Sequence, residues 1–291
     1  MQRVGILHQS HIPQAVVTAE ALAARAKELG RAVWLRSSWD DGLAQLDVSD
    51  TGLIICVGGD GTLLRVTRVA APSGVPILGV NAGRLGFLTE VDASDALDVL
   101  PHALAGEGWT EERVMLAVEY GEMTAYALND AIISRGSPAR TVQTNVSVNG
   151  TELLAVRGDG IIVASATGST AYNLAAGGPV LPPATQELVL NPVSAHPAAE
   201  SAVLLEPAVV VSIRVKTDHG AFLSLDGQED YPVSDGAEII IRESPHRARF
   251  LRFRPPGYFY ASLSDLLHRR RRHPDLPDPD AASGAAARQG E

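Results

Sequence analysis

The sequence predicts an α/β N-terminal domain with a parallel-type sheet, followed by a β-rich C-terminal domain. Short apolar segments alternate with helical segments near the N-terminus, whereas closely spaced strands follow from Arg113 onward. The length of 291 residues suits two ordinary domains. We place the domains at 1–105 and 106–258, a helix that returns to the first domain at 259–272, and a disordered tail rich in Pro, Asp and Ala at 273–291.

The first domain shows strand and helix signals in a regular order. The unbroken apolar run Gly52–Val57 is typical of a strand that is buried on both faces of a parallel sheet. Ile12–Leu29 is Ala-rich and helical, and Gly30 suits the residue after its end. The predicted elements are Arg3–Leu7, Ile12–Leu29, Ala32–Leu35, Gly52–Val57, Leu63–Ala71 and Val75–Val80.

The second domain shows mainly strand signals. Asn149-Gly150 predicts a hairpin, and a short helix is expected after Gly168. Asn129-Asp130 ends one apolar strand and begins another, and Leu263–Arg270 is a final helix. The predicted strand segments are Val114–Glu119, Ala125–Ser134, Gln143–Val148, Leu153–Val156, Gly160–Ala164, Val209–Lys216, Ala221–Leu225, Glu238–Arg242 and Arg249–Arg254.

Composition excludes several classes of function. The net charge of −10 argues against a nucleic-acid partner, and no apolar run is long enough to span a membrane. Cys56, the single cysteine, excludes a disulfide scaffold and a thiolate zinc cluster, so we expect a reducing, cytoplasmic location. The histidines show no metal-ligand spacing, and we expect no metal site built by the protein.

The common phosphate-binding motifs are missing. A Walker A loop needs a lysine after glycine, and neither Lys27 nor Lys216 follows one. The sequence also contains no GxGxxG fingerprint. Any phosphate would therefore be bound by another kind of loop.

Gly58-Gly59-Asp60-Gly61-Thr62 follows a buried strand and opens a helix. Glycines let the backbone approach a ligand, and amides at a helix N-terminus attract phosphate. A carboxylate there fits a base that takes a proton from an attacking hydroxyl. The alternative is a tight turn in which Asp60 only caps the helix. Arg65 lies further along the helix and is a candidate phosphate contact or a surface arginine.

A second polar block runs from Thr167 to Asn173. Its hydroxyls and glycines suit a nucleotide site, with Tyr172 stacking on a base or covering a ribose, whereas helix capping alone explains Ser169 or Thr170. The preceding Gly158-Asp159-Gly160 is a turn or part of the same site.

Three further segments each allow two interpretations. Asn129-Asp130 suits an adenine edge or a ribose diol, but also a bulge or turn. Phe87 closes the glycine-rich segment Asn81–Phe87 and either walls a site or packs in the core. Asp226-Gly227-Gln228 is a hairpin turn first and a ligand loop second.

Together these motifs resemble the NAD kinase family, also called ATP-NAD kinase or inorganic polyphosphate/ATP-NAD kinase. The resemblance runs from about Val4 to about Leu267. It rests on Gly58–Thr62, Leu85–Leu88, Asn129-Asp130, and the block from Gly158-Asp159-Gly160 through Thr167–Tyr172 to Gly177-Gly178-Pro179. The first motif also occurs in lipid kinases, whereas the long block is much more specific.

The resemblance implies transfer of the γ-phosphoryl of ATP, or of a polyphosphate terminus, to the 2′-hydroxyl of the adenosine ribose of NAD. NAD would bind between the two domains, a divalent cation such as Mg²⁺ would arrive with ATP, and the protein would form a homodimer or homotetramer. Asp60 is then the proton acceptor and a substrate contact. The other implied NAD contacts are Gly61, Phe87, Asn129, Asp130, Arg140, Arg157, Asp159, Thr167, Thr170, Ala171, Tyr172, Asn173, Leu174, Ala175 and Gln228. The implied phosphate contacts are Gly58, Gly59, Gly61, Thr62 and Arg65.

The chain departs from the family pattern at three places. Asp130 stands where the family usually has Glu, and Ala166 stands where it often has Pro. Val193–Pro197 matches a Pro-His stretch only loosely, so we leave His196 out of the site.

Two rival functions come from other classes. A lipid kinase of the diacylglycerol or sphingosine type shares the first motif, but the acidic charge and the polar block from Thr167 disfavour it. A non-catalytic NAD(P)-binding sensor would not need Asp60, which is present.

Overall fold

The computed structural model describes residues 3–83, 86–195 and 201–271. The chain divides into two compact units, Met1–Phe253 and Arg254–Glu291. The described part of the second unit contains α5 (Tyr258–Arg271), which includes the predicted final helix. Its return to the first domain stays a prediction, and the predicted tail lies outside the described residues. No helix within the described ranges is long and apolar enough to cross a membrane.

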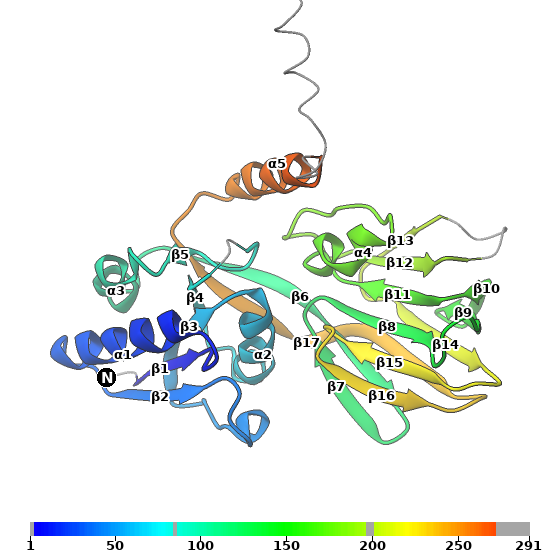
Figure 1. Ribbon diagram of the computed structural model, residues 1–291, viewed down its shortest axis with the longest axis horizontal. Helices are drawn as coiled ribbons and strands as arrows, with labels where there is room; N and C mark the ends of the chain where they lie inside the picture. Colours follow the sequence, from blue (N-terminus) through cyan, green and yellow to red (C-terminus); the bar gives the residue numbers. More distant parts are fainter. Residues whose placement is uncertain (1–2, 84–85, 196–200, 272–291) are drawn as a thin grey trace, which may run out of the picture. The chain divides into compact units, whose positions relative to one another are not determined.

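The N-terminal half is a parallel sheet with helices on both faces (Figure 1). Its strands pair in the order β4-β3-β1-β2, and all of these pairs are parallel. The predicted elements are confirmed, with small shifts at their ends. Their bounds are β1 (Arg3–His8), α1 (Pro13–Glu28), β2 (Val33–Ser37), η1 (Leu43–Gln45), β3 (Thr51–Gly58), α2 (Asp60–Ala70), η2 (Ala71–Ser73), β4 (Ile77–Asn81) and β5 (Val91–Asp92).

Side chains of β3 alternate between two cores, which explains its unbroken apolar sequence. Ile55 packs with α1 and α3 (Ala96–Ala105) on one face. Ile54 and Cys56 pack with α2 on the other face. Gly30 follows Leu29, the C-cap of α1, and has a φ of 76°, as predicted for the residue after the helix end. The sequence analysis missed α3 because Pro101 lies inside it, and proline normally interrupts a helix.

A long strand, β17 (Glu238–Arg252), joins the two halves of the molecule (Figure 1). It pairs antiparallel with β6 (Trp109–Tyr120) and β14 (Val210–Lys216), and parallel with β4 through Phe250. The prediction of two separate strands here was wrong. The pairing with β6 shifts register between Glu243 and Arg247, and Pro245 lies in that interval. A proline has no N–H to donate to a neighbouring strand, so Pro245 suggested that one strand ended and another began there.

The C-terminal half is a sandwich of two sheets around an apolar core. The large sheet continues through β17 to β14, β9 and β10, with β6 and β7 off this path. The smaller sheet has six strands in the order β13-β12-β11-β8-β15-β16. The bounds are β7 (Met123–Ala127), β8 (Asp130–Arg135), β9 (Val142–Val148), β10 (Thr151–Gly158), β11 (Gly160–Ala164), η3 (Gly168–Thr170), α4 (Tyr172–Ala175), β12 (Leu188–Val193), β13 (Val203–Leu205), β15 (Ala221–Leu225) and β16 (Glu229–Val233).

The chain passes from the large sheet to the small one at Leu128-Asn129, between β7 and β8. This confirms that Asn129-Asp130 separates two apolar strands. The Asn149-Gly150 hairpin between β9 and β10 is also confirmed, with φ of 51° and 77° at the two residues. α3 ends at Ala105, and the domain boundary predicted after this residue stays a prediction.

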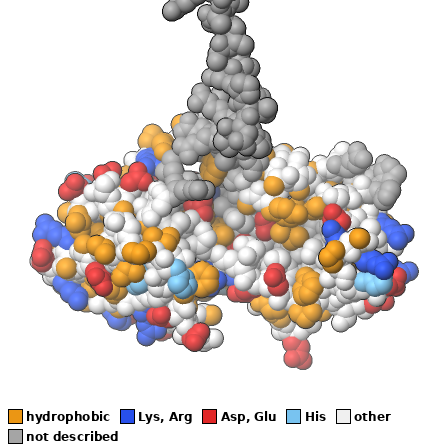
Figure 2. Space-filling view, in the orientation of Figure 1, with side chains coloured by type: hydrophobic (Ala, Val, Ile, Leu, Met, Phe, Trp, Pro, Cys, Tyr) orange, Lys and Arg blue, Asp and Glu red, His pale blue; other side chains and the backbone are white. Residues whose placement is uncertain are grey.

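Charged side chains of both signs are interspersed on the face shown in Figure 2. On that face, the described residues form no continuous basic surface of the kind that binds nucleic acid without sequence preference.

Candidate active site

The Asp60 carboxylate is fixed at the carboxyl edge of the parallel sheet. Its Oδ2 accepts a hydrogen bond from Phe87 N at 2.9 Å, and its Oδ1 accepts one from Leu88 N at 3.0 Å. Gly59 is the N-cap of α2, and no side chain caps this helix. The capping interpretation of Asp60 was therefore wrong. Two backbone donors hold the carboxylate and leave it further lone pairs.

The glycines around Asp60 differ in their surroundings. A Cβ on Gly86 would lie 2.1 Å from Asp60 Oδ1, and a Cβ on Gly58 would lie 2.4 Å from Thr62 Oγ1, so both positions need glycine for packing. A Cβ on Gly59 would meet no atom within 4 Å, and one on Gly61 would meet only Gln228 Nε2 at 3.9 Å. Gly59 and Gly61 therefore border open space, where a ligand can approach.

Thr62 was predicted to contact phosphate, but the structure places its side chain elsewhere. Its side chain is buried beneath Gly58, and its backbone N donates to Gly59 O at 2.9 Å. The structure thus places Thr62 in the packing of the turn.

The turn between β15 and β16 holds the segment Leu128–Asp130, where the chain passes from the large sheet to the small one. We call this segment the Asn129 crossing. The Asp226 carboxylate accepts hydrogen bonds from the backbone N of Leu128 at 3.1 Å, Asn129 at 2.7 Å and Asp130 at 3.3 Å. Burial raises the pKa of Asp226, while Arg68 and the backbone donors of Asn129 and Leu128 oppose that rise. The turn residue Asp226 thus fixes the backbone of the crossing.

Arg68 of α2 connects the same turn to the N-terminal half. Its Nη2 lies 3.1 Å from Asp226 Oδ2 and donates to Leu225 O at 3.0 Å. Its Nη1 lies 2.6 Å from Glu229 Oε1. Gln228 Nε2 also donates to Gly61 O at 2.7 Å. The sequence analysis missed Arg68 and interpreted Asp226 as part of a hairpin turn first and of a ligand loop second. In the structure the two side chains together set the glycine-rich turn against the Asn129 crossing.

Asp130 is a buried carboxyl with only 3% of its surface exposed. Burial, with a smaller contribution from the charge of Asp226, raises its pKa from 3.8 to about 7. Near neutral pH this carboxyl therefore exists in both protonation states, so it can donate or accept a hydrogen bond.

The Thr167–Thr170 segment packs directly on Asn129. Ser165 N donates to Asn129 O at 2.9 Å, and Ser165 Oγ donates to Leu128 O at 2.5 Å. A Cβ on Gly168 would lie 2.0 Å from Asn129 O, so this close approach needs glycine. The structure thus brings two predicted motifs, the Asn-Asp pair and the hydroxyl-rich block, into contact.

Arg113 at the start of the apolar part of β6 is a buried cation that the sequence analysis missed. Its Nη1 donates to Thr167 Oγ1 at 3.4 Å and its Nη2 donates to Glu111 at 2.9 Å. Burial lowers its pKa to about 10, against the opposing charges of Glu111 and Asp60. Arg252 donates to Leu88 O at 2.8 Å, and the backbone N–H of the same Leu88 donates to Asp60. The three adjacent charges at Glu111–Arg113, directly before the apolar run Val114–Val118, were the available signal.

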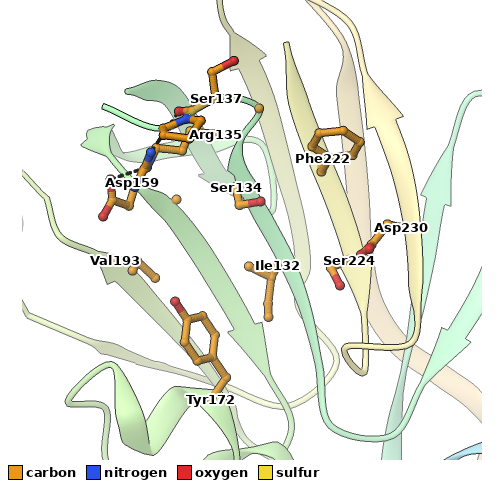
Figure 3. Close-up of a pocket in the computed structure, with 13 residues that line it drawn as sticks. Ile132, Ser134, Arg135, Ser137, Asp159, Tyr172, Val193, Phe222, Ser224 and Asp230 are labelled. Carbon is orange, nitrogen blue, oxygen red and sulfur yellow. Dashed lines mark hydrogen bonds and ion pairs between the residues drawn. The ribbon is translucent and has the colours of Figure 1, made fainter. Parts of the chain in front are cut away.

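A pocket of about 590 Å³ lies on the outer face of the small sheet (Figure 3). Tyr172, 46% exposed, directs its ring into the pocket from α4. Asp159 lies across from it, and its carboxylate is 2.6 Å from Arg135 Nε. Phe222 lines the pocket from β15. Tyr172 and Asp159 are therefore gathered around one cavity, together with Arg135 and Phe222, which the sequence analysis did not single out.

Other predicted site residues lie neither beside Asp60 and the Asn129 crossing nor in the pocket with Tyr172. The guanidinium of Arg65 stacks on Trp39, and Arg157 Nε donates to Thr141 Oγ1 at 3.0 Å on the exposed side of β10. Arg140 is exposed in the loop after β8. Asn173 is buried and donates to Pro179 O at 2.9 Å.

The remaining predicted NAD contacts lie beside Thr167 and Tyr172. Thr170 Oγ1 donates to Thr167 O at 3.2 Å. Ala171, Leu174 and Ala175 flank Tyr172 at α4, and the part of the chain that the structure describes does not include His196.

A carboxylate held by two backbone donors beside two glycines that border open space suits a kinase that phosphorylates a hydroxyl group. The model of the ATP-NAD kinase N-terminal domain matches residues 5–108, and that of the ATP-NAD kinase C-terminal domain matches residues 128–253. The chain therefore belongs to the ATP-NAD kinase family and is a phosphotransferase, as the sequence resemblance predicted.

Curated relatives agree over nearly the whole chain. A NAD kinase of Dehalococcoides mccartyi is 37% identical over 272 residues, which cover 91% of this chain and 96% of that protein. A NAD kinase of Symbiobacterium thermophilum is 38% identical over 282 residues, covering 92% and 99%. The lipid kinase and sensor alternatives find no support among these relatives.

Solved structures share the fold. A NAD kinase from Archaeoglobus fulgidus, crystallised in complex with ATP, is 26% identical with a TM-score of 0.73, covering 91% of this chain and 98% of that one. Yeast NADH kinase, complexed with NADH, has a TM-score of 0.79 at 20% identity, covering 92% and 88%. At 20% identity, the similarity to yeast NADH kinase shows only that the two proteins share a fold.

Proposed function

We propose that this chain transfers the γ-phosphoryl group of ATP to the 2′-hydroxyl of the adenosine ribose of NAD, forming NADP and ADP. The observation that carries the proposal is the Asp60 carboxylate, held by Phe87 N and Leu88 N between two glycines that border open space. A carboxylate in this place serves the acceptor hydroxyl better than a phosphate, because like charges repel.

In the proposed reaction, Asp60 accepts the proton of the 2′-hydroxyl as its oxygen attacks the γ-phosphorus. The bond between the γ-phosphorus and the bridging oxygen breaks, and ADP leaves. Such a base contributes about 10²–10⁴ to the rate, and correct positioning contributes more. We place the phosphoryl oxygens beside the backbone of Gly59–Gly61, because Gly59 and Gly61 border open space.

The Asn129 crossing is the proposed seat of the adenosine ribose. Asn129 supplies an amide, and Asp130, with its pKa of about 7, supplies a carboxyl that can pair with a ribose hydroxyl in either protonation state. Thr167 lies against the same crossing through Gly168. We place the nicotinamide half in the pocket between Tyr172 and Asp159.

A divalent cation, Mg²⁺ in the simplest case, is part of this proposal. The described residues contain no cluster of three or more side chains that could hold a metal ion. This composition suits an ion that enters on the triphosphate and keeps several waters, as Mg²⁺ does at nucleotide sites. When bound, it would neutralise charge on the transferring phosphoryl group.

The assembly and location remain proposals as well. The family resemblance supports a homodimer or homotetramer. The single cysteine, Cys56, is buried and free, and burial raises its pKa far above the ordinary value, so it needs no oxidising compartment. The buried, free cysteine fits a cytoplasmic enzyme.

The first test is NADP formation from NAD, ATP and Mg²⁺, followed with an NADP-specific dehydrogenase. Polyphosphate and diacylglycerol are run in parallel as donor and acceptor alternatives. We expect ATP-dependent NADP formation. No NADP with NAD still bound would favour a sensor, and phosphorylated lipid would show that the acceptor is wrong.

A further inference from the structure

A group of charged side chains is buried beside the pairing of β6 with β17. Glu111 Oε2 is shared by two arginines and lies 2.9 Å from Arg113 Nη2 and 2.8 Å from Arg252 Nε. Arg252 Nη1 also lies 3.3 Å from Glu90 Oε2. We call this group the buried charge network; its members, with side chains 4% to 12% exposed, are Glu90, Glu111, Arg113 and Arg252.

Strand alternation places one arginine of β17 inside the molecule and another outside. Arg252 and Phe250 are two residues apart, so their side chains share one face, and the Arg252 guanidinium carbon lies 5.1 Å from the ring centroid of the fully buried Phe250. Arg249 faces the opposite side and pairs with Glu112, with side chains 45% and 51% exposed. The same strand thus carries a buried and an exposed arginine–glutamate pair.

The shared glutamate stays ionised in the network. Burial alone would raise the pKa of Glu111, but the charges and hydrogen bonds of Arg113 and Arg252 outweigh it and lower that pKa. Burying ion pairs adds little net stability, because the desolvation of the charges offsets their attraction. Stability is therefore a poor reason for this network, and its place in the fold suggests another role.

Arg252 connects the network to the backbone that holds Asp60. Leu88 lies between β4 and β5 and belongs to neither strand. Its carbonyl O accepts a hydrogen bond from Arg252 Nη1 at 2.8 Å, and its N–H donates to Asp60 Oδ1 at 3.0 Å. Glu90, paired with the same arginine, accepts a hydrogen bond from Phe253 N at 2.8 Å. The end of β17 therefore holds this segment at both Leu88 and Glu90.

We propose that Arg252 is a positioning residue for phosphoryl transfer: it holds the Leu88 backbone, so that the Leu88 N–H keeps the Asp60 carboxylate aimed at the acceptor hydroxyl. Arg252 acts on Asp60 through Leu88 and not by contact with a substrate. A displacement of about 1 Å in a reacting group can lower the rate on the order of 10²-fold. The role in transfer rests on the proposed function, whereas the support of the Asp60 carboxylate does not.

The test replaces Arg252 by Met, which removes the guanidinium and keeps an unbranched side chain. Arg252→Met should lower kcat on the order of 10- to 10²-fold and leave the KM for NAD little changed, since Asp60 acts in the chemical step. In the NAD-free protein, amide hydrogen exchange at Leu88 should become faster. The amide of Ile54 in β3, which donates to Pro76 O, reports opening of the sheet and should change less.

Arg249→Met is the matched control on the same strand. Arg249 Nε lies 2.9 Å from Glu112 Oε1, and its Nη1 donates to Gly74 O at 3.3 Å, so it makes the same two kinds of contact as Arg252. Gly74 follows the C-terminal end of α2, however, whereas Asp60 is the first residue of that helix. Arg249→Met should therefore leave both kcat and the exchange at Leu88 unchanged.

A second variant serves if Arg252→Met does not fold, because that change leaves two buried carboxylates to one arginine. Glu90→Gln/Arg252→Met removes one charge of each sign, and an amide oxygen can still accept the Phe253 N–H. Compared with Glu90→Gln alone, it should show the same loss of kcat and the same faster exchange at Leu88.

An unchanged kcat in folded Arg252→Met would overturn the proposal. So would an equal loss of kcat in Arg249→Met, or an equal acceleration of exchange at Leu88 and Ile54, which would mark a merely structural role. If the unmodified protein forms no NADP while exchange at Leu88 still depends on Arg252, the proposed function fails and the support of the Asp60 carboxylate stands.

Discussion

Two aspartates in glycine-containing turns, Asp60 and Asp226, accept backbone hydrogen bonds in different settings. Asp60 accepts two backbone N–H groups and borders open space at Gly59 and Gly61. Asp226 accepts three and is paired with Arg68, and its side chain is fully buried. The two carboxylates thus differ in exposure more than in hydrogen bonding. This difference predicts that Asp60 can serve as a base toward a substrate, whereas Asp226 only holds the backbone.

The largest effect is expected on turnover. Asp60→Asn should lower kcat by about 10²–10⁴, because the amide cannot accept the hydroxyl proton. It should cost only about 1 kcal/mol in stability, since one backbone donor loses its acceptor. Steady-state kinetics and thermal unfolding measure the two quantities. Near-normal turnover in a folded variant would remove Asp60 as the base.

The opposite pattern is expected at the buried aspartate. Asp226→Asn should lower the free energy of unfolding by about 3–5 kcal/mol, because it leaves Arg68 without its buried partner. The KM for NAD should rise more than kcat falls, since the Asn129 backbone loses its support.

Glu229→Gln is the matched control for that change. Glu229 pairs with the same arginine but is 44% exposed, so its loss should cost about 1 kcal/mol or less. Denaturant unfolding of both variants provides the comparison. Equal costs would mean that burial does not distinguish the two partners of Arg68.

A pH-dependent effect is expected at Asp130. Its pKa is raised in the folded state, so its contribution to stability is fully present below about pH 4 and is lost as pH rises through about 7. Between these values the wild-type protein should lose up to about 4 kcal/mol relative to Asp130→Asn. Denaturant unfolding of both proteins at about pH 4 and about pH 8, values chosen to span the interval between the unfolded and folded pKa, tests this. If the difference in unfolding free energy between the two proteins does not change with pH, Asp130 does not titrate in this range.

The smallest effect is expected in the outer pocket. Tyr172→Ala should raise the KM for NAD on the order of tenfold and change kcat little, because its exposed ring offers uniform binding by stacking. Asn173→Ala, at the buried neighbour, should instead lower stability. An unchanged KM for NAD in Tyr172→Ala would leave its ring outside the NAD site.

The local signals were read correctly where the physical cause lies within a few residues. The buried strand Thr51–Gly58, the glycine-rich turn that follows it and the Asn149-Gly150 hairpin each depend on neighbouring side chains and backbone angles. The break at Asn129 was also visible, because a polar pair interrupted an apolar run.

By itself the sequence determined the α/β and β-rich halves, the family and the position of Asp60, since periodicity and short motifs carry that information. The tertiary structure decided the partners of these motifs. Arg68 meets Asp226 across 158 positions and Arg113 meets Thr167 across 54, pairings set by strand order and by the passage of β17 through both halves. It also decided that Asn173 is buried while Tyr172 is exposed, because burial depends on what packs over a residue and not on its neighbours in the chain.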